Sequence, residues 1–579
     1  MSDSPTFATP DVEAERRDDG AWILRSRSAL GVYEPRIGTV LEDRALATPH
    51  ADLLCERDGD GTWRRVTYRE AWDAARSIGQ ALLDRGLEQS RPVMVLSGNS
   101  IDHGLLMLAC YVAGVPIVPV SVAYSLQSTD HSKLRHIFQK TRPGLIFATP
   151  EEAFAPALAS LDLDGVDVTH SLTELRAAAP GVRIEDAYRA TGPDTIAKYL
   201  FTSGSTGLPK GVINTHRMLC SNQQQAREVW LFLAREPVVL VDWLPWSHTF
   251  GGNHNFNLVL WSGGTMHIDA GRPVPGLVET TVRNLREVSP TAYFNVPAGF
   301  AALVPFLESD ADLATRFFAR VRLVVYAAAA LPAELWERLD VLARRFAPRP
   351  VPLTASWGST ETAPLATSAH FPLDGPGCIG VPVPGVELKM VPNGRKLELR
   401  VKGPNVTPGY VGEPDLTRAA FDSERFYCMG DAGRFVDPDR PERGIVFDGR
   451  VAEDFKLTTG TWVSVGTLRT ALVSAGAGAI TDAVLTGHDR HEVGALVWLS
   501  PVGNLDALRG AIEKHNADNS QSSTRIARVL VLGEPPSIDG HEITDKGYIN
   551  QRAVLERRAA DVARLHAADA EADDVVLFP

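Results

Sequence analysis

Residues 198–217, KYLFTSGSTGLPKGVINTHR, constrain the fold more than any other stretch of the chain. One apolar run ends at Phe201, and a second begins at Gly211. The glycines between them let successive backbone N–H groups turn toward one concave spot, where an anion can be held. The sequence predicts a strand–loop–strand unit that binds a polyphosphate, with a helix only from about Met218. Its expected ligand-binding residues are Thr202, Ser203, Gly204, Ser205, Thr206, Gly207 and Lys210.

This loop differs from a Walker A loop, because Pro209 stands where the pattern GxxxxGK[ST] requires glycine. Loops rich in serine and glycine also occur as flexible connections without a ligand. A Thr/Ser/Gly core closed by Pro-Lys-Gly between two apolar runs is a less common pattern. It favours phosphate binding.

Composition excludes several classes of protein. The 579 residues are 44% hydrophobic and 22% charged, which is typical of a globular chain with several folding units. The net charge of −13 argues against nucleic-acid binding, because phosphate backbones require a basic surface. Anionic ligands must therefore be held by local cations and backbone N–H groups. The five cysteines form no CxxC pair, so we expect reduced thiols rather than a disulfide framework or a metal site.

Two features bear on the location of the protein. Residues 1–20 are polar and acidic and lack the apolar segment of a secretion signal. Residues 104–123 carry no charge, but they contain Pro116 and Pro119 and divide into a helix and a short strand. We therefore expect a cytoplasmic protein without a membrane span.

Strands and helices alternate along the first two thirds of the chain. A capping box at Thr67–Glu70 opens a helix with apolar residues at helical spacing. Such alternation predicts parallel, doubly wound sheets with helices on both faces. The expected strands are residues 93–96, 116–120, 145–148, 238–244 and 322–327, and the expected helices include residues 100–113 and 130–140.

The pattern changes twice after residue 376. Short runs at 387–391, 396–401 and 433–436 lie between Gly, Pro and Asp turns and predict a small antiparallel or barrel-like β unit. The later elements predict a hairpin, a helix, a strand and a polar helical tail with a frayed end near 567–575. We expect an α/β protein with two domains, a large one at 1–450 and a small, mobile α+β domain at 451–579.

Several later segments carry side chains that suit a phosphate-binding enzyme. In the segment WGSTET, Thr360 offers a hydroxyl and Glu361 a carboxylate, and a carboxylate beside a triphosphate suits Mg²⁺. Asp431 ends a strand, where it can accept the ribose hydroxyls, and Arg450 lies at the domain boundary. Each residue also has a structural interpretation, such as an N-cap or an Asp-Gly turn. Lys546, in ITDKGY, is of a kind that is usually solvated.

A second group of residues suits an organic substrate. His248 lies between Trp246 and Phe250, where it can line a pocket for an aromatic acid. The small side chains after Tyr326 let a flat base approach the backbone. The pocket candidates are His248, Phe250, Phe294, Asn295, Pro297, Gly299 and Tyr326.

The order of these segments resembles a known family. TSGSTGLPKG, LPWSHTFGG, YAAAALP, WGSTETAP, YCMGD, DGR and a late TDKG are similar to the acyl-adenylate-forming superfamily of acyl-CoA ligases, adenylation domains and luciferases. The resemblance extends from about residue 40 to about residue 560. GSTETAP, EDFKLTTGTWVSVGTLR and EITDKGYINQRAVLERRA look like bacterial feruloyl-CoA synthetases.

The resemblance implies two half-reactions. ATP and a carboxylate give an acyl-adenylate and pyrophosphate, and CoA then displaces AMP. It implies that Thr202–Thr206 and Lys210 hold the β- and γ-phosphates, that Glu361 binds Mg²⁺ and that Thr360 contacts the α-phosphate. The adenine would lie against Trp357, Gly358 and the alanines Ala328, Ala329 and Ala330, and the ribose against Asp431 and Arg450. Lys546 would bridge the carboxylate and the α-phosphate in the adenylating state.

The family also repositions its small C-terminal domain between the half-reactions, and a boundary at 450–453 suits such a hinge. The chain departs from the family pattern at three places. The hinge residue aligns with Ala452 or Glu453, and Met429 replaces a threonine before Gly-Asp. Trp462 replaces an arginine near the CoA phosphates, which leaves Lys456 as a candidate CoA contact.

The first functional hypothesis is therefore an aromatic acid–CoA ligase that acts on a hydroxycinnamate-type acid such as ferulate. The alternatives are a ligase for a fatty or benzoic acid, an adenylation enzyme that loads a carrier protein in trans, and a non-catalytic nucleotide-binding relative. The expected partners are the acid, ATP and CoA. The sequence leaves the oligomeric state open.

Overall fold

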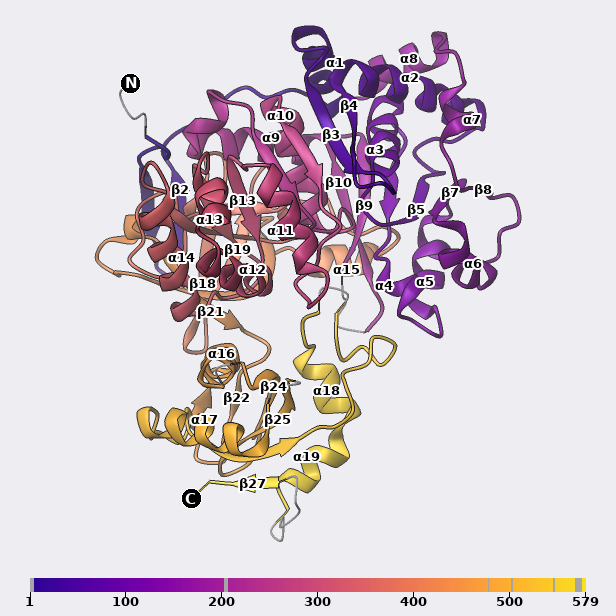
Figure 1. Cartoon of the computed structure of the whole chain (residues 1–579). Coiled ribbons are helices and arrows are strands. Elements are labelled where there is room, and N and C mark those ends of the chain that lie inside the picture. The colour runs from indigo at the N-terminus through magenta and orange to yellow at the C-terminus, as the bar shows by residue number, and fades with distance from the viewer. Residues whose placement is uncertain are drawn as a thin grey trace.

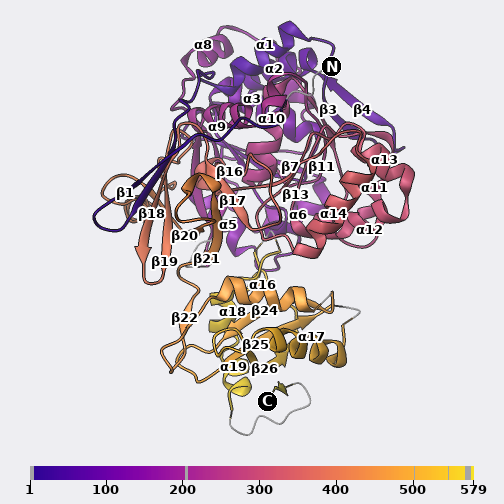
Figure 2. The same ribbon diagram turned by 90° about the vertical axis from the view of Figure 1, so that its left-hand side faces the viewer.

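The computed structural model describes residues 5–202, 207–476, 478–500, 503–544, 547–567 and 575–578. A large N-terminal part carries three sheets, and a smaller C-terminal part lies beneath it (Figure 1). A second view, turned by 90°, shows the same separation (Figure 2). The expected α/β class with a large and a small part is confirmed. The exact boundary at 450–451 stays a prediction.

The phosphate-loop segment belongs to a six-stranded sheet with the order β10-β9-β6-β5-β7-β8. Its strands are parallel except for β10, which pairs antiparallel with β9. The expected strand–loop–strand unit is therefore present. The bounds are β5 (Val93–Ser97), β6 (Ile117–Pro119), β7 (Leu145–Thr149), β8 (Asp167–Thr169), β9 (Ile196–Thr202) and β10 (Lys210–Thr215).

A four-stranded sheet, ordered β11-β12-β3-β4, lies beside the first. The capping box holds, because the Thr67 hydroxyl accepts from the Glu70 N–H and the Glu70 carboxylate accepts from the Thr67 N–H. It starts α2 (Tyr68–Asp84), which packs on α3 (Ile101–Ala113). The strands are β3 (Asp52–Arg57), β4 (Trp63–Thr67), β11 (Val239–Asp242) and β12 (Thr265–Ile268).

The third sheet has eleven strands in the order β1-β2-β18-β19-β20-β21-β17-β16-β15-β14-β13. The antiparallel strands expected as a separate unit continue through β17 and β16 into parallel strands, so one sheet joins both regions. The expected strand at 433–436 is the end of a longer strand, and the hairpin β1–β2 was not anticipated. The bounds are β1 (Val12–Arg16), β2 (Trp22–Ser26), β13 (Ala292–Asn295), β14 (Leu323–Tyr326), β15 (Leu353–Gly358), β16 (Leu365–Ser368), β17 (Cys378–Pro382), β18 (Glu387–Asn393), β19 (Lys396–Lys402), β20 (Tyr427–Phe435) and β21 (Ile445–Arg450).

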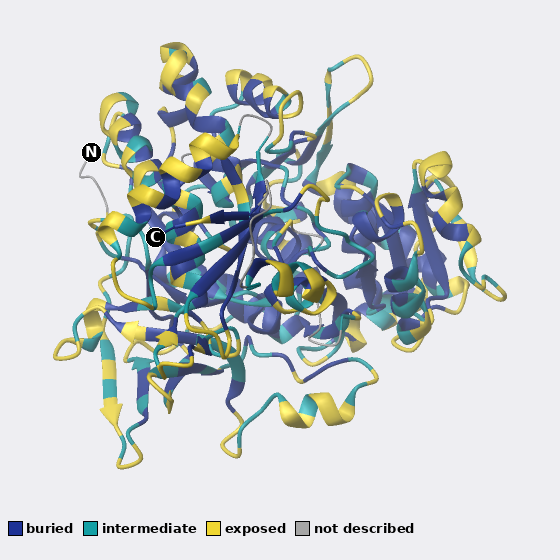
Figure 3. Cartoon of the chain, turned by 90° about the horizontal axis from the view of Figure 1, so that it is seen from below, coloured by how far each residue is buried: buried dark blue, intermediate teal, exposed yellow. Residues whose placement is uncertain are grey.

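Helices cover the sheets, and inner strands such as β5 and β17 are fully buried, whereas the edge strands β1, β4 and β8 are not (Figure 3). No helix among the described residues combines the length and the apolar character needed to cross a bilayer. The other helices of the N-terminal part are α1 (Ile37–Ala47), α4 (Ala123–Leu126), α5 (Ser132–Thr141), α6 (Glu151–Ala159), α7 (Thr173–Arg176), α8 (Val182–Ala190), α9 (His216–Val229), α10 (Phe256–Ser262), α11 (Val278–Glu287), α12 (Pro297–Ser309), α13 (Ala311–Phe318), α14 (Ala333–Phe346) and α15 (Pro414–Ala419).

The C-terminal part has its own sheet, ordered β24-β25-β26-β27. Alternate residues of β24 face different cores, since Ala483 and Leu485 pack with α16 and α17 while Val484 packs with α18 and α19. The tail does not end as a helix, because β27 pairs with β26. The elements are β22 (Phe455–Lys456), β23 (Trp462–Val463), α16 (Val465–Ala475), β24 (Ile480–Thr486), β25 (Val493–Leu499), α17 (Leu505–Asp518), β26 (Ile526–Val531), α18 (Gln551–Arg557), α19 (Ala559–Leu565) and β27 (Val575–Leu577).

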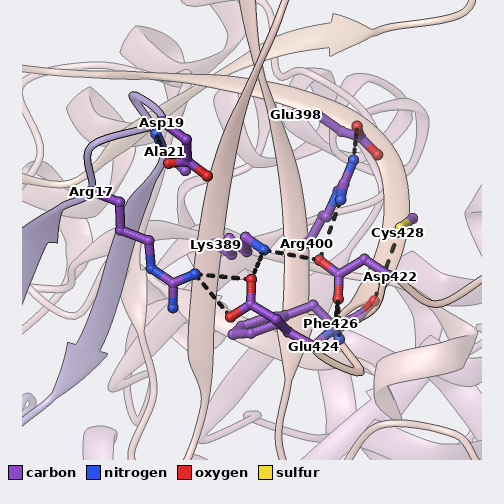
Figure 4. A network of polar contacts seen from close by, with 10 residues as sticks. All are labelled: Arg17, Asp19, Ala21, Lys389, Glu398, Arg400, Asp422, Glu424, Phe426 and Cys428. Carbon is purple, nitrogen blue, oxygen red and sulfur yellow. Dashed lines mark hydrogen bonds and ion pairs between the residues drawn. The ribbon is translucent and has the colours of Figure 1, made fainter.

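A charged network ties the N-terminal hairpin to the strands that lead into the site (Figure 4). Lys389 of β18 pairs with Asp422 at 3.1 Å and with Glu424, and Arg17 donates to Glu424 at 2.8 Å. Arg400 of β19 also reaches Asp422 at 3.2 Å. The network holds the turn that precedes β20.

We expect Lys389→Met to lower the free energy of unfolding by about 1–3 kcal/mol, because Lys389 is buried and its loss leaves two carboxylates short of a partner. Urea denaturation followed by fluorescence measures the change. Lys402→Met is the matched control, since Lys402 lies over the same Phe426 ring but is exposed. Equal losses in the two variants would contradict this role for the network.

Candidate active site

Three parallel strands of the large sheet bring the candidate residues to one edge. Asn295 at the end of β13 is in register with Tyr326 at the end of β14, and Tyr326 is in register with Ala355 of β15. Ligands of open α/β sheets bind beyond the carboxyl ends of such strands. The exposed residues Ala328, Ala329 and Ala330 follow β14 at this edge.

The segment after β15 turns sharply into a short 3₁₀ helix, η3 (Thr360–Thr362). Gly358 permits the turn, since a Cβ atom there would lie 1.7 Å from the Pro364 carbonyl oxygen. Ser359 caps the helix by accepting a hydrogen bond from the Glu361 N–H at 3.2 Å. This geometry buries both Thr360 and Glu361 at the edge of the sheet.

Glu361 meets the end of the phosphate loop in a compact polar cluster. The Lys210 ammonium lies 3.0 Å from Glu361 Oε1 and donates to the Tyr410 hydroxyl at 2.7 Å. Tyr410 in turn donates to Glu361 Oε1 at 3.0 Å, and its hydroxyl lies 2.9 Å from that of Tyr427. A cation, a carboxylate and two phenols thus share one site beside the strand–loop–strand unit.

The charges of this cluster depend on one another. Burial by itself would raise the pKa of the Glu361 carboxyl, but the adjacent Lys210 ammonium outweighs burial and lowers it to about 2. Burial likewise works against the charge of Lys210, and the Glu361 carboxylate and the Tyr410 hydroxyl reverse the effect and raise the Lys210 pKa. Burial raises the pKa of Tyr410 to about 12. At neutral pH the site therefore holds an ion pair between neutral phenols.

The donor set at this position suits a magnesium ion. Glu361 supplies one hard carboxylate, and Mg²⁺ is commonly held by one or two carboxylates together with substrate phosphates and water. Among the described residues, no three His, Cys, Asp or Glu side chains form a metal-binding group. A metal at Glu361 would therefore take its remaining ligands from a polyphosphate and solvent, which fits a nucleotide site better than a structural metal site.

Asp431 and Trp357 form a second polar contact at this site. Asp431 lies within β20 and not at a strand end as expected, because the pairing of β20 with β21 continues past it to Phe435. The Trp357 indole N–H donates to Asp431 Oδ2 at 2.9 Å, and Arg450 Nε lies 3.5 Å from Oδ1. Burial raises the pKa of Asp431 despite the nearby arginine. Met429, which replaces a hydroxyl residue of the family pattern, instead accepts from the Ser359 hydroxyl at 3.7 Å.

The structure describes the borders of the phosphate loop. Thr202 Oγ1 is buried and has no hydrogen-bond partner within the described part of the chain. Ser203, Gly204, Ser205 and Thr206 lie outside the described residues, and so does Lys546. Gly207, at the border of the phosphate loop, lies against His541, five residues before Lys546, because a Cβ atom on Gly207 would lie 2.9 Å from the His541 ring.

Four aromatic rings pack together at the π-helix η2 (Thr249–Asn255), which contributes Phe250 and His254. Phe294 lies 5.0 Å from the His254 ring and 5.8 Å from the Trp230 ring, and Phe250 lies 6.4 Å from Phe294. Burial lowers the pKa of His254 to about 4, so the cluster is uncharged at neutral pH. Lys198 of β9 donates to the Gly252 carbonyl at 3.1 Å and ties this segment to the strand that precedes the phosphate loop.

A comparison with known protein families decides the classification. The sequence profile described as AMP-binding enzyme matches residues 41–411. The chain belongs to the AMP-binding enzyme family. Enzymes of this family use ATP, Mg²⁺ and CoA, and this chain is an enzyme of their acid ligase class.

Individual relatives agree with this classification. The AMP-binding enzyme is 27% identical to a 4-hydroxybenzoate–CoA/benzoate–CoA ligase of Rhodopseudomonas palustris, over 78% of this chain and 83% of the relative. It is 25% identical to a mitochondrial malonate–CoA ligase of Mus musculus, over 89% and 90% of the two chains. Its fold matches ATP-bound MatB of R. palustris with a TM-score of 0.70 and 24% identity, over 91% of this chain and 99% of that one. The superfamily resemblance is confirmed, whereas a specific likeness to feruloyl-CoA synthetases stays a prediction.

Not every candidate residue of this AMP-binding enzyme lies in the polar cluster. Asn295 accepts from the Val296 N–H at 2.8 Å and packs against Gly299, where a Cβ atom would lie 2.1 Å from the Asn295 side chain. His248 is buried at the start of η2. Lys456 lies in the C-terminal part, 4.9 Å from the centre of the Trp462 ring.

Sequence reasoning missed three residues of this AMP-binding enzyme. Tyr410 and Tyr427 complete the cluster around Glu361, and His254 completes the aromatic group. Tyr427 opens the segment YCMGD, so the motif itself carried a signal for that residue. Tyr410 and His254 have no such local pattern, because their role depends on partners 49 and 40 positions away.

Proposed function

We propose that this protein activates a compact aromatic carboxylic acid with ATP and transfers the acyl group to CoA. The observation that carries the adenylation step is the cluster of Lys210, Glu361 and Tyr410 at the end of the strand–loop–strand unit. It presents a cation for phosphate oxygens and a carboxylate for Mg²⁺ at one place. When a nucleotide enters, the ion pair between Lys210 and Glu361 would separate. Lys210 would then bind a phosphate oxygen, and Glu361 would bind Mg²⁺.

The other nucleotide contacts follow from the edge of the large sheet. The Thr202 hydroxyl, which has no partner among the described residues, would hold the β- and γ-phosphates with Ser203–Thr206 and Gly207, and Thr360 would hold the α-phosphate. The adenine would lie over Ala328–Ala330 beside Trp357 and Gly358. Asp431 and Arg450 would bind the ribose hydroxyls. Bound Mg²⁺ would neutralise part of the phosphate charge at Glu361.

In the first half-reaction, a carboxylate oxygen attacks the α-phosphorus of ATP and forms an O–P bond. The bond to the pyrophosphate oxygen breaks, and pyrophosphate leaves with its electron pair. Two anions approach each other in this step, so a cation is needed where charge accumulates. We assign that role to Lys546, because His541, five residues before it, lies close to Gly207.

In the second half-reaction, the CoA sulfur, after its proton is lost to solvent, attacks the acyl carbon. The bond from that carbon to the phosphate oxygen breaks, and AMP leaves. Lys456 is the proposed contact for a CoA phosphate, at the surface of the C-terminal part. A hinge at Ala452 or Glu453 would bring this surface to the site.

The aromatic cluster supports a flat, compact acid. Trp230, His254 and Phe294 are all buried and pack against one another, so they leave little space for a long chain behind Phe250. A hydroxycinnamate-type acid such as ferulate is the first candidate. A benzoate-type acid is the second, because the R. palustris relative is named for 4-hydroxybenzoate and benzoate.

We expect ferulate or coumarate to saturate both pyrophosphate release and CoA consumption, and long-chain fatty acids to be poor substrates. Phe250→Ala should raise the KM for the aromatic acid about tenfold, since one buried aromatic contact contributes roughly 1.5 kcal/mol. The KM for ATP should not change. Steady-state kinetics over an acid panel measures both effects.

Phe346→Ala is the control, because Phe346 is a partly buried ring outside the aromatic cluster. Saturation by a long-chain acid alone would overturn the aromatic assignment, and preference for benzoate would select the second candidate. Pyrophosphate release without CoA consumption would instead indicate transfer to a carrier protein.

A further inference from the structure

The loop of residues 537–542 in the C-terminal part is hydrogen-bonded to the N-terminal part. The Asp539 carboxylate accepts from the Ser128 hydroxyl at 2.6 Å, from the Thr129 N–H at 2.9 Å and from the Thr129 hydroxyl at 2.8 Å. The buried Lys133 ammonium donates to the Ile538 carbonyl at 2.6 Å. These donors lie at the start of α5, and Nε2 of His136 on that helix lies 3.0 Å from the carbonyl oxygen of Pro209, just before β10.

This loop is rigidly held within its own part of the chain. Glu542 is fully buried and forms a two-pronged ion pair with Arg558 at 2.6 and 2.9 Å. The same carboxylate accepts from the Ser537 N–H at 2.8 Å, and the Ser537 hydroxyl accepts from the Gly540 N–H at 2.9 Å. Asp539 therefore moves together with the rest of the C-terminal part.

The two parts also meet near Arg450, where the chain crosses from the N-terminal part to the C-terminal part (the chain crossover). Lys396 of β19 pairs with the buried Asp454 at 2.5 Å and donates to the Asp448 carbonyl at 2.6 Å. This contact lies within four residues of Arg450, so a rotation about the crossover displaces it little. Asp539 is 89 residues beyond Arg450 in sequence, and its contact with Ser128 must break when the C-terminal part turns.

We propose that Asp539 is a positioning residue that latches the C-terminal part in the adenylate-forming arrangement and releases it for thioester formation. The inference rests on the proposed function and deepens it. Asp539 precedes Lys546 by seven residues, and the Ile543–Ile549 bridge pairs the residues on either side of the segment that carries Lys546. Holding Asp539 against Ser128 and Thr129 therefore fixes where the segment that carries Lys546 begins.

The contact suits a reversible latch. Hydrogen bonds to an ionised carboxylate are stronger than neutral ones, and three of them share a single side chain. All three break together when one rigid loop moves away. Ser128 and Thr129 are small and neutral, and the Lys133 ammonium, which donates to the Ile538 carbonyl, would be solvated once the loop moves away.

The first test is Asp539→Asn, assayed separately for the two half-reactions. We expect acid-dependent pyrophosphate exchange to fall on the order of 10- to 100-fold, whereas thioester formation from preformed acyl-adenylate stays equal or becomes faster. Glu556→Gln is the matched control, because it makes the same change of charge at an exposed i,i+4 pair with Arg552. Unchanged half-reactions, or an equal fall in both, would overturn the latch.

The second test does not depend on the Asn variant. In Ser128→Cys/Asp539→Cys the sulfurs replace Ser128 Oγ and Asp539 Cγ, and the oxygen bonded to that Cγ, Oδ1, lies 2.6 Å from Ser128 Oγ. We expect a disulfide under oxidising conditions that retains pyrophosphate exchange and blocks thioester formation, with recovery on reduction. Failure to form the bond, or retention of both reactions when oxidised, would contradict the proposal.

The two proposals fail in different ways. If the native protein releases no pyrophosphate with any acid, the proposed function is wrong, but the disulfide still reports whether the two parts meet at Asp539. If the native protein adenylates and Asp539→Asn behaves like Glu556→Gln, the latch alone is wrong.

Discussion

Lys546→Ala is expected to lower the rate of acyl-adenylate formation by about 10²–10³-fold, which corresponds to roughly 3–4 kcal/mol of transition-state stabilisation. The ammonium group would otherwise offset the charge that accumulates as the carboxylate approaches the α-phosphate. Thioester formation from a preformed acyl-adenylate should persist, because the lysine has no part in it. Rapid-quench measurement of each half-reaction checks both statements.

Lys514→Ala provides the control, since Lys514 is an exposed lysine on α17 in the same part of the chain. It should leave both half-reactions unchanged. Loss of both half-reactions in equal measure in Lys546→Ala would argue against the assigned role and for a general defect of the C-terminal part.

Glu361→Gln is expected to lower pyrophosphate release by about 10²–10³-fold and to raise the Mg²⁺ concentration needed for half-maximal rate. Glutamine keeps the shape of the side chain and can still accept from Tyr410, so the variant should fold. It removes the carboxylate that would bind the metal. Titration of the rate with Mg²⁺, together with thermal unfolding, separates a catalytic effect from loss of structure.

Glu308→Gln is the matched control, because Glu308 forms an exposed pair with Arg338 in the same part of the chain. An unchanged Mg²⁺ requirement in Glu361→Gln would exclude Glu361 as the metal ligand.

The ion pair between Lys210 and Glu361 should also persist in acid, since the pKa of Glu361 is lowered to about 2 while that of an ordinary glutamate is about 4.5. The stability that this pair contributes is present above pH 4.5 and is lost as the pH falls toward 2.

Local patterns predicted the elements that depend on local physics. The capping box at Thr67, the helix after Ser100 and the hairpin around the phosphate loop all follow from short-range hydrogen bonding and apolar spacing. The joining of the antiparallel strands into the eleven-stranded sheet was missed, as was β27. Strand partners far apart in sequence leave no periodic signal in either strand.

The residues of the candidate site also divide into those that a local pattern predicted and those that depend on distant partners. Lys210, Glu361 and Asp431 were singled out as candidates because each stands in a motif with its own turn chemistry. Tyr410 and Asp539 were missed, since the first acquires its role from Glu361 and the second from Ser128 and Thr129.

The sequence by itself determined the chemical groups present, namely a glycine- and hydroxyl-rich loop, its closing lysine and the acids Glu361 and Asp431 of later motifs. Those properties reside in side chains and in backbone freedom at single positions. Only the tertiary structure decided which groups meet: that Lys210 is neutralised by Glu361, that two tyrosines complete the pair, and that Asp539 joins the two parts of the chain. Such contacts depend on how sheets and domains pack over distances that no local pattern encodes.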